Sequence, residues 1–350
     1  GLIWPTAGEI KINGKSVYPG SPALAQLGSF VEGPGLLPHL KMPEFREFKR
    51  SFGELIDERA IELMNQVKGT NKKLAIMYSG GIDSTAILCS MLKNCSDKDI
   101  KEKIVVLLSD HSILENPNFY NDYVIKKFEC VSSFRFPYFV GNDNFLLVSG
   151  ENADQLFGSQ VTGKFTAYRP YEFLFETLEN TQEEVIAWIR SRLEDEYKQY
   201  ATKYYDMFKK LCDAAPVKID TLYKFLWWIN FTNKWQSVYV RILPYTLNRD
   251  SIKIEENYTT FYATDEFQLW SMNNVDNLVE KESYITKYAA KQYIIDVNGD
   301  KSYINKPKIG SLAKMVKQKM APMTIDIDMK YNYEYPSEDM YNYDNSFVDF

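Results

Sequence analysis

Two short motifs contain the serine, glycine and acidic residues that are candidates for a functional site. The first is a glycine-rich segment, Ser79–Ser84, which follows an apolar run at 74–78. A chain that passes from a strand through glycines into a helix leaves backbone N–H groups unpaired at the helix start, and these bind phosphate. Asp83 would repel a bare phosphate, which indicates a bridging Mg²⁺, unless it or Ser84 merely caps the helix. The residues assigned to this site, with Asp83 acting through the metal ion, are Ser79, Gly80, Gly81, Asp83, Ser84 and Thr85.

The second motif, Ser149–Gly158, follows another apolar run at 145–148. Open α/β sheets bind ligands beyond the carboxyl ends of their strands. We therefore expect Glu151 and Asp154 to lie at that edge of a sheet, whereas Leu156 and Phe157 have the character of core residues. The residues of this motif assigned to the nucleotide site are Ser149 and Gly150.

Both motifs resemble those of a known family. The first, SGGIDS, resembles the SGGxDS pyrophosphate loop of N-type ATP pyrophosphatases, which cleave ATP between its α and β phosphates. The second, SGENADQLFG, resembles the SGEGADELFGG pattern in the synthetase domain of asparagine synthetases, with eight of the first ten positions identical. Asn152 stands where that family has a glycine, and Gln155 stands where it has a glutamate.

The resemblance implies a fold, a reaction and roles for the matching residues. The fold is α/β, with a mostly parallel sheet, helices on both faces and a helical C-terminal part. The reaction uses ATP to activate a carboxylate as an acyl-adenylate, releases pyrophosphate and passes the acyl group to ammonia or an amine. Asp83 and Asp154 match the aspartates that hold Mg²⁺. Glu151 matches the glutamate that takes a proton from the nitrogen nucleophile, which attacks only when neutral.

A lysine near the end completes the resemblance. The stretch 305–311 resembles the family segment RxKxxF, whose lysine contacts the phosphates. Lys308 falls at the lysine position and Lys306 at the arginine position, so both are expected to assist catalysis, although Ser311 replaces the aromatic residue. Cations there would neutralise charge that develops on the phosphates. The alternative is a solvated basic turn.

The periodicity of apolar residues predicts the elements that position these motifs. Buried strands are predicted at 74–78, 104–108 and 145–148, and an edge strand at 134–140 because of Pro137. Helices are predicted at about 42–67 and from 85 onward, with mainly helical stretches at 171–235 and 265–296. The alternation of strands and helices favours a mostly parallel sheet.

Three regions are expected along the chain. Residues 1–41 form a short segment with a strand running into a turn at 8–14, and residues 324–350 form an acidic, tyrosine-rich tail. Between them lies a synthetase-like domain at 42–323, with an α/β core at about 70–165 and a helical part at about 166–323. Residues 109–112 are a candidate for adenine contacts, by position only.

The composition disfavours nucleic-acid-binding, zinc-binding and membrane-spanning proteins. The net charge of −6 over 350 residues disfavours a broad nucleic-acid surface. Four cysteines without CxxC spacing and only two histidines indicate reduced thiols and no zinc site. No apolar stretch has the length of a membrane span and no signal peptide is evident, so a cytoplasmic location is expected.

The source of nitrogen is open, because no cysteine precedes Cys89 to serve as the nucleophile of a glutaminase domain. Free ammonia, ammonia from a separate subunit, or an amino group on a larger substrate would each serve, and the carboxylate could belong to a small molecule or a peptide. Lasso-peptide cyclases and β-lactam synthetases use related domains to join the two groups within one molecule. Further alternatives are thiolation or nucleobase modification, which the lack of a cysteine pair disfavours, and a degenerate homologue that only binds nucleotide or a partner.

Overall fold

A computed structural model describes residues 10–12, 15–18, 42–166, 169–193, 195–240 and 256–306. The predictions for Lys308 and for the tail at 324–350 lie outside these residues. The chain divides into two compact units, each made of several segments, and we describe each unit by itself. The sheet unit comprises Lys49–Ala153, Tyr239–Trp270 and Lys287–Phe350. The helical unit comprises Gly1–Phe48, Asp154–Val238 and Ser271–Thr286.

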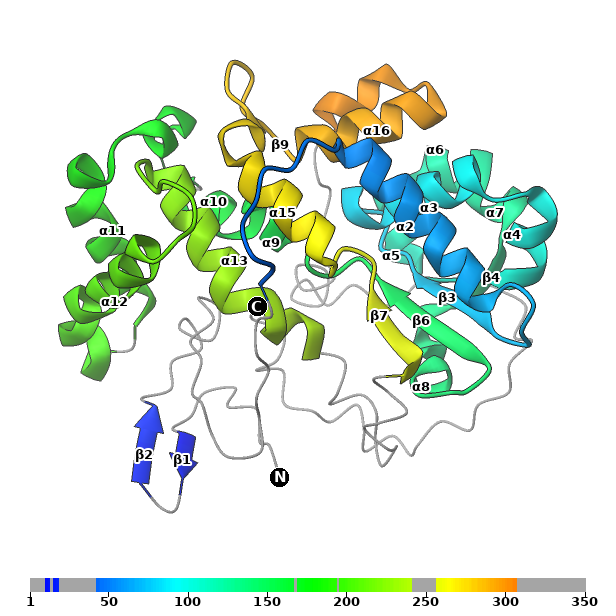
Figure 1. The fold of residues 1–350 in the computed structure, drawn as a ribbon, viewed down its shortest axis with the longest axis horizontal. Helices are drawn as coiled ribbons and strands as arrows, with labels where there is room; N and C mark the ends of the chain where they lie inside the picture. Colours follow the sequence, from blue (N-terminus) through cyan, green and yellow to red (C-terminus); the bar gives the residue numbers. More distant parts are fainter. Residues whose placement is uncertain are drawn as a thin grey trace. The chain divides into compact units, whose positions relative to one another are not determined.

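The sheet unit contains a five-stranded, all-parallel sheet with the strand order β5-β4-β3-β6-β7. Strands β4, β3, β6 and β7 are labelled in Figure 1. Its three central strands, β4, β3 and β6, are the three buried strands predicted from the sequence, so the α/β class is confirmed. The strands are β3 (Lys73–Met77), β4 (Ile104–Leu108), β5 (Glu129–Ser132), β6 (Phe145–Ser149) and β7 (Tyr258–Thr260).

The edges of the sheet differ from the prediction. The edge strand predicted at 134–140 is wrong, since the chain there forms a 3-10 turn, η2 (Ser133–Arg135), and a short helix, α8 (Phe136–Phe139). Pro137 stands in the first turn of α8, where the N–H that proline lacks would have no helical partner. The true edges are β5 and β7, both short, and β7 follows β6 by more than a hundred residues.

Apolar side chains on alternate strand positions bury both faces of this sheet. Ala75, Val105 and Leu147 lie on one face in a cluster with Phe139 of α8. Because successive strand residues point to opposite faces, neighbours such as Ile76 belong to the other face, and they too are fully buried.

The first long helix, α2 (Phe52–Val67), begins ten residues later than predicted. Ser51 accepts a hydrogen bond from the backbone N–H of Glu54, and the Glu54 carboxylate accepts one from the Ser51 N–H. This reciprocal cap satisfies backbone groups at the helix start and fixes where the helix begins. Residues 42–51 form no regular element. Among the described residues the sheet unit also contains α3 (Ile82–Asn94), α4 (Asp97–Lys103), α5 (Asp110–Glu115), α6 (Pro117–Phe119), a π-helical turn η1 (Tyr120–Val124), α7 (Ile125–Lys127), most of α15 (Asp265–Asn273), α16 (Tyr288–Asn298) and η7 (Lys301–Asn305).

The helical unit confirms the helical stretch predicted at 171–235. Its elements there are η3 (Tyr171–Phe175), α11 (Leu178–Arg192), η4 (Asp195–Tyr200), α12 (Ala201–Asp213) and α13 (Leu222–Val240). It also holds α10 (Ser159–Thr166), most of α9 (Ala153–Phe157), η6 (Val275–Asn277) and two strand pairs, β1 (Ile10–Ile12) with β2 (Lys15–Tyr18) and β8 (Val279–Glu280) with β9 (Ile285–Thr286).

The stretch predicted as helical at 265–296 contains α15 (Asp265–Asn273) and α16, but the β8–β9 pair separates them. None of the helices in the described part of the chain is both long and apolar enough to cross a bilayer.

Candidate functional site

The glycine-rich loop lies where the central strand β3 passes into α3. Gly80 has φ +76°, and a Cβ added to it would stand 2.2 Å from the backbone carbonyl oxygen of Ser112, so only glycine fits. Ser79 is exposed and Gly81 is half-buried, so the loop is open to solvent on either side of the buried Gly80.

The start of α3 contradicts the simple capping alternative. The N-cap is Gly81, which has no side chain to cap the helix, and neither Asp83 nor Ser84 occupies that position. The Ser84 hydroxyl instead accepts from the Ser79 N–H at 3.1 Å and donates to the Gly81 carbonyl oxygen at 3.2 Å. This arrangement holds the turn in shape and leaves the start of α3 without a side-chain cap, which is the feature that favours an anion.

The second motif begins beside the first. Strand β6 pairs in parallel with β3, with Val148 opposite Ile76, so both motifs leave the sheet at its carboxyl edge. A Cβ added to Gly150 would stand 3.6 Å from the Cβ of Asp83 and from the backbone nitrogen of Ser84. The fold therefore brings together two segments that are about seventy positions apart in sequence, as the strand pattern predicted.

Asn152 keeps the backbone geometry that a glycine would have at this position. It has φ +70°, in the left-handed region that asparagine tolerates better than most residues. Its side-chain oxygen accepts a hydrogen bond of 2.9 Å from the Thr260 hydroxyl on β7, and the residue is 1% exposed. Asn152 therefore adopts a backbone conformation that glycine reaches without strain. Glu151, the predicted base, is half-buried in this turn, and its N–H donates to the Ser149 hydroxyl.

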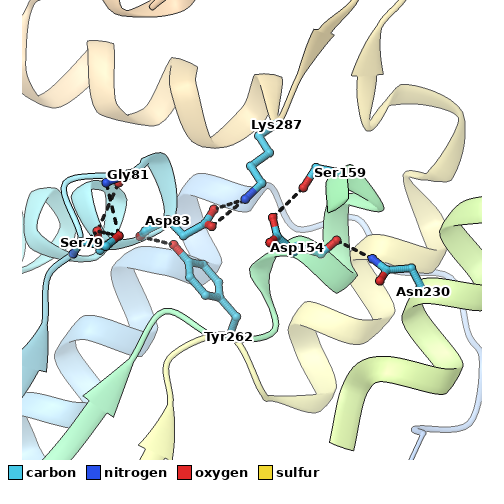
Figure 2. Close-up of polar contacts among 9 residues, drawn as sticks. Ser79, Gly81, Asp83, Asp154, Ser159, Asn230, Tyr262 and Lys287 are labelled. Atoms are coloured by element: carbon cyan, nitrogen blue, oxygen red, sulfur yellow. Dashed lines mark hydrogen bonds and ion pairs between the residues drawn. The ribbon is translucent and has the colours of Figure 1, made fainter. Parts of the chain in front are cut away.

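The side chain of Asp83 contacts a lysine that the sequence did not indicate. The Lys287 ammonium donates to both carboxylate oxygens of Asp83, at 2.7 and 2.6 Å, and the Tyr262 hydroxyl donates to the Asp83 backbone carbonyl at 2.9 Å (Figure 2). Lys287 and Tyr262 are 204 and 179 positions away in sequence. No local motif marks Lys287, so only the tertiary fold reveals it.

Asp154 belongs to the helical unit, where α13 holds the helix that carries it. The Ser159 hydroxyl donates to its carboxylate at 2.7 Å, and the Asn230 side chain donates to its backbone carbonyl at 2.9 Å (Figure 2). Tyr223 and Trp227 of α13 donate to the carbonyl oxygens of the next turn of α9. Because Asp83 lies in the other unit, the shared Mg²⁺ predicted for the two aspartates stays a prediction.

Gln155, the second departure from the family pattern, is buried in the helical unit. It is 1% exposed, and neither atom of its side-chain amide has a hydrogen-bond partner among the described residues. A charged carboxylate without a partner at this position would cost far more than a neutral amide. The glutamine is therefore the less costly residue here.

Lys306 donates to the side-chain oxygen of Asn116 at 2.6 Å. Burial lowers the pKa of this lysine, although the carboxylate of Glu115 acts in the opposite direction. Glu115 in turn lies against the phosphate loop, because a Cβ on Gly80 would stand 2.8 Å from its Cβ. The structure thus places Lys306 against the α5–α6 junction, beside the helix that packs on the loop.

The segment at 109–112, predicted to contact adenine, begins α5 next to the loop. Ser109 caps this helix by accepting from the Ser112 N–H. Asp110 is 6% exposed, burial raises the pKa of its carboxyl, and one of its oxygens has no partner in the part of the chain that the structure describes. This position is compatible with a ligand contact at the carboxyl end of β4.

The described residues at the loop include a side chain of the type that binds Mg²⁺. Asp83 is a carboxylate at an open phosphate loop, and its contact with a lysine ammonium shows that the position accommodates a cation. The described residues bring no three His, Cys, Asp or Glu side chains together as a metal site. Magnesium commonly binds through one or two carboxylates and takes its remaining ligands from phosphate and water.

The cysteines do not form a reactive centre among the described residues. All four are free, and burial raises the pKa of Cys95 to about 11 and that of Cys130 and Cys212 to about 12. These thiols therefore stay protonated at neutral pH, where the thiolate is the nucleophilic form.

No protein-family model matches the chain, and a search of curated proteins found no significant match.

Proposed function

We propose that this protein is an ATP-dependent amide-forming ligase. It adenylates a carboxylate, releases pyrophosphate and transfers the acyl group to ammonia or an amine, as asparagine synthetases do. The observation that carries the proposal is the placement of Gly150 against Asp83, which joins the two motifs at the carboxyl edge of an all-parallel sheet. Free, largely buried thiols agree with a cytoplasmic location.

The glycine-rich loop binds the phosphates of ATP. The backbone passes close to the ligand at Gly80 and Gly81, and the start of α3 directs its N–H groups and partial positive charge toward the anion. Asp83, with Asp154 as its predicted partner, would hold Mg²⁺, which when bound offsets phosphate charge and orients the bond to be broken. Lys287 adds a buried ammonium at the same carboxylate.

Glu151 acts in the second half of the reaction. Its place after Gly150 puts a carboxylate in the turn next to the phosphate loop. There it accepts the proton of the attacking amine, so that the nitrogen adds to the acyl carbon while neutral and AMP leaves. Lys306 positions its segment through Asn116, and Lys308 remains the proposed phosphate contact.

Substituting Gly80 by alanine tests the phosphate loop without knowledge of the acceptor. Because the added Cβ would meet the Ser112 carbonyl oxygen at 2.2 Å, the loop must shift. We expect Gly80→Ala to weaken binding of α,β-methylene-ATP by tenfold or more, measured by calorimetry with Mg²⁺ present. Gly69→Ala is the matched control, because Gly69 has a similar φ of +78° with no atom within 4 Å of an added Cβ. Equal affinities for the wild type and Gly80→Ala would contradict the loop assignment.

The activity itself is tested by isotope exchange between pyrophosphate and ATP. We expect exchange that depends on Mg²⁺ and on an added carboxylate, screened with amino acids, dicarboxylic acids and short peptides. An intramolecular cyclase is the second candidate, and exchange supported only by a peptide that becomes cyclic would identify it. Nucleotide binding without exchange for any carboxylate would favour a degenerate homologue instead.

A further inference from the structure

The ion pair between Lys287 and Asp83 differs from an ordinary surface salt bridge. The Lys287 side chain is 9% exposed and the Asp83 side chain 24% exposed, and the ammonium contacts both carboxylate oxygens (Figure 2). A lysine this buried is seldom found without a charged partner, because desolvating an ammonium is costly. The ion pair is therefore a fixed part of the loop structure and not a chance contact between two exposed, flexible side chains.

The backbone at both ends of this pair is fixed. Lys287 has φ +56° in the left-handed region at the N-cap of α16, a conformation that non-glycine residues seldom adopt. Asp83 lies in the first turn of α3, and the buried Tyr262 donates to its carbonyl oxygen. The lysine is thus directed at the one carboxylate of the phosphate loop.

We propose that Lys287 is the resident counter-cation of Asp83 and competes with the divalent metal for its carboxylate. A metal ion that ligates Asp83 shares the carboxylate with the ammonium, and repulsion between the two cations weakens the contact that each makes with it. Phosphate bound at the loop would offer the ammonium a second anion, so that metal alone binds weakly and metal with phosphate binds well. This inference rests on the proposed function, because it takes Asp83 as a metal ligand.

The competition predicts that removing the lysine strengthens the binding of metal alone. We expect Lys287→Met to bind Mn²⁺ about tenfold more tightly than the wild type in the absence of nucleotide, measured on the full chain by electron paramagnetic resonance of free Mn²⁺. A structural role alone would leave this affinity unchanged or lower it. Lys287→Gln, which keeps a hydrogen-bond donor without the charge, gives the same expectation if the methionine variant does not fold.

The chain offers a matched control on the same helix. Lys291 of α16 is equally buried, at 8% exposed, but its ammonium donates to the backbone carbonyl of Ile304 at 2.8 Å. We expect Lys291→Met to leave Mn²⁺ affinity unchanged and Asp83→Asn to abolish the gain in a double variant with Lys287→Met. Equal or weaker Mn²⁺ binding by both Lys287 variants, or a gain that survives Asp83→Asn, would overturn the proposal.

The measurement separates this inference from the proposed function. Mn²⁺ binding is measured without ATP or an acceptor, so a gain in Lys287→Met supports the competition even if no carboxylate supports exchange. Exchange activity in the wild type together with unchanged Mn²⁺ affinity in the variants would retain the ligase and refute the competition.

Discussion

Replacing Asp83 with asparagine should abolish pyrophosphate release while the protein remains folded. Asparagine has nearly the shape of aspartate, but it lacks the charge that binds a metal and that pairs with Lys287. Loss of a carboxylate that holds Mg²⁺ on the phosphates should lower pyrophosphate–ATP exchange by about a thousandfold or more, since charge stabilisation is the main requirement of such a transfer. The measurements are exchange activity and thermal unfolding of the same preparation.

Asp57→Asn is the matched control for this variant. Asp57 of α2 also contacts a lysine, Lys93, at 2.6 Å, and its side chain is 22% exposed, close to the value for Asp83. It lies outside both motifs, so we expect its loss to lower stability without lowering exchange beyond a few-fold. Asp154→Asn should reproduce the loss seen for Asp83→Asn. Exchange that persists in both motif variants would show that neither carboxylate holds the metal.

Replacing Glu151 with glutamine should separate the two halves of the reaction. Glutamine keeps the size of the side chain but cannot accept a proton, so adenylation should continue while amide formation slows. We expect pyrophosphate–ATP exchange within about threefold of wild type and a fall in amide formation by 10²–10⁴, the usual contribution of a general base. Hydroxylamine, which attacks without needing a base at neutral pH, should restore product formation.

Glu129→Gln controls for the loss of a half-buried glutamate in the same unit. Glu129 begins β5, at the opposite end of the sheet strands from the two motifs, and pairs with Lys73 at 2.9 Å. We expect both half-reactions to proceed as in the wild type. If Glu151→Gln lost exchange and amide formation equally, Glu151 would have to act during adenylation, and its assignment as the amine's base would be wrong.

The central strands, and the fact that the two motifs meet, could be predicted from the sequence. The runs at 74–78, 104–108 and 145–148 are apolar at nearly every position, which is typical of strands buried on both faces of a parallel sheet. Because parallel strands end at one edge, a motif that follows each strand must reach that edge. The apolar residues at 85–92 also predicted a helix after the first motif, where the structure has α3.

The sheet edges and the contact between Lys287 and Asp83 could not be predicted, because they depend on how distant segments pack. Strands β5 and β7 have four and three residues, too few to give a clear alternation, and β7 reaches the sheet through a pairing with β6 that no local pattern encodes. The N-cap at Ser51 outweighed the apolar periodicity before it, so α2 began later than predicted. Lys287 looks like any solvated lysine in the sequence, and it becomes a buried cation because the fold brings the start of α16 to the start of α3.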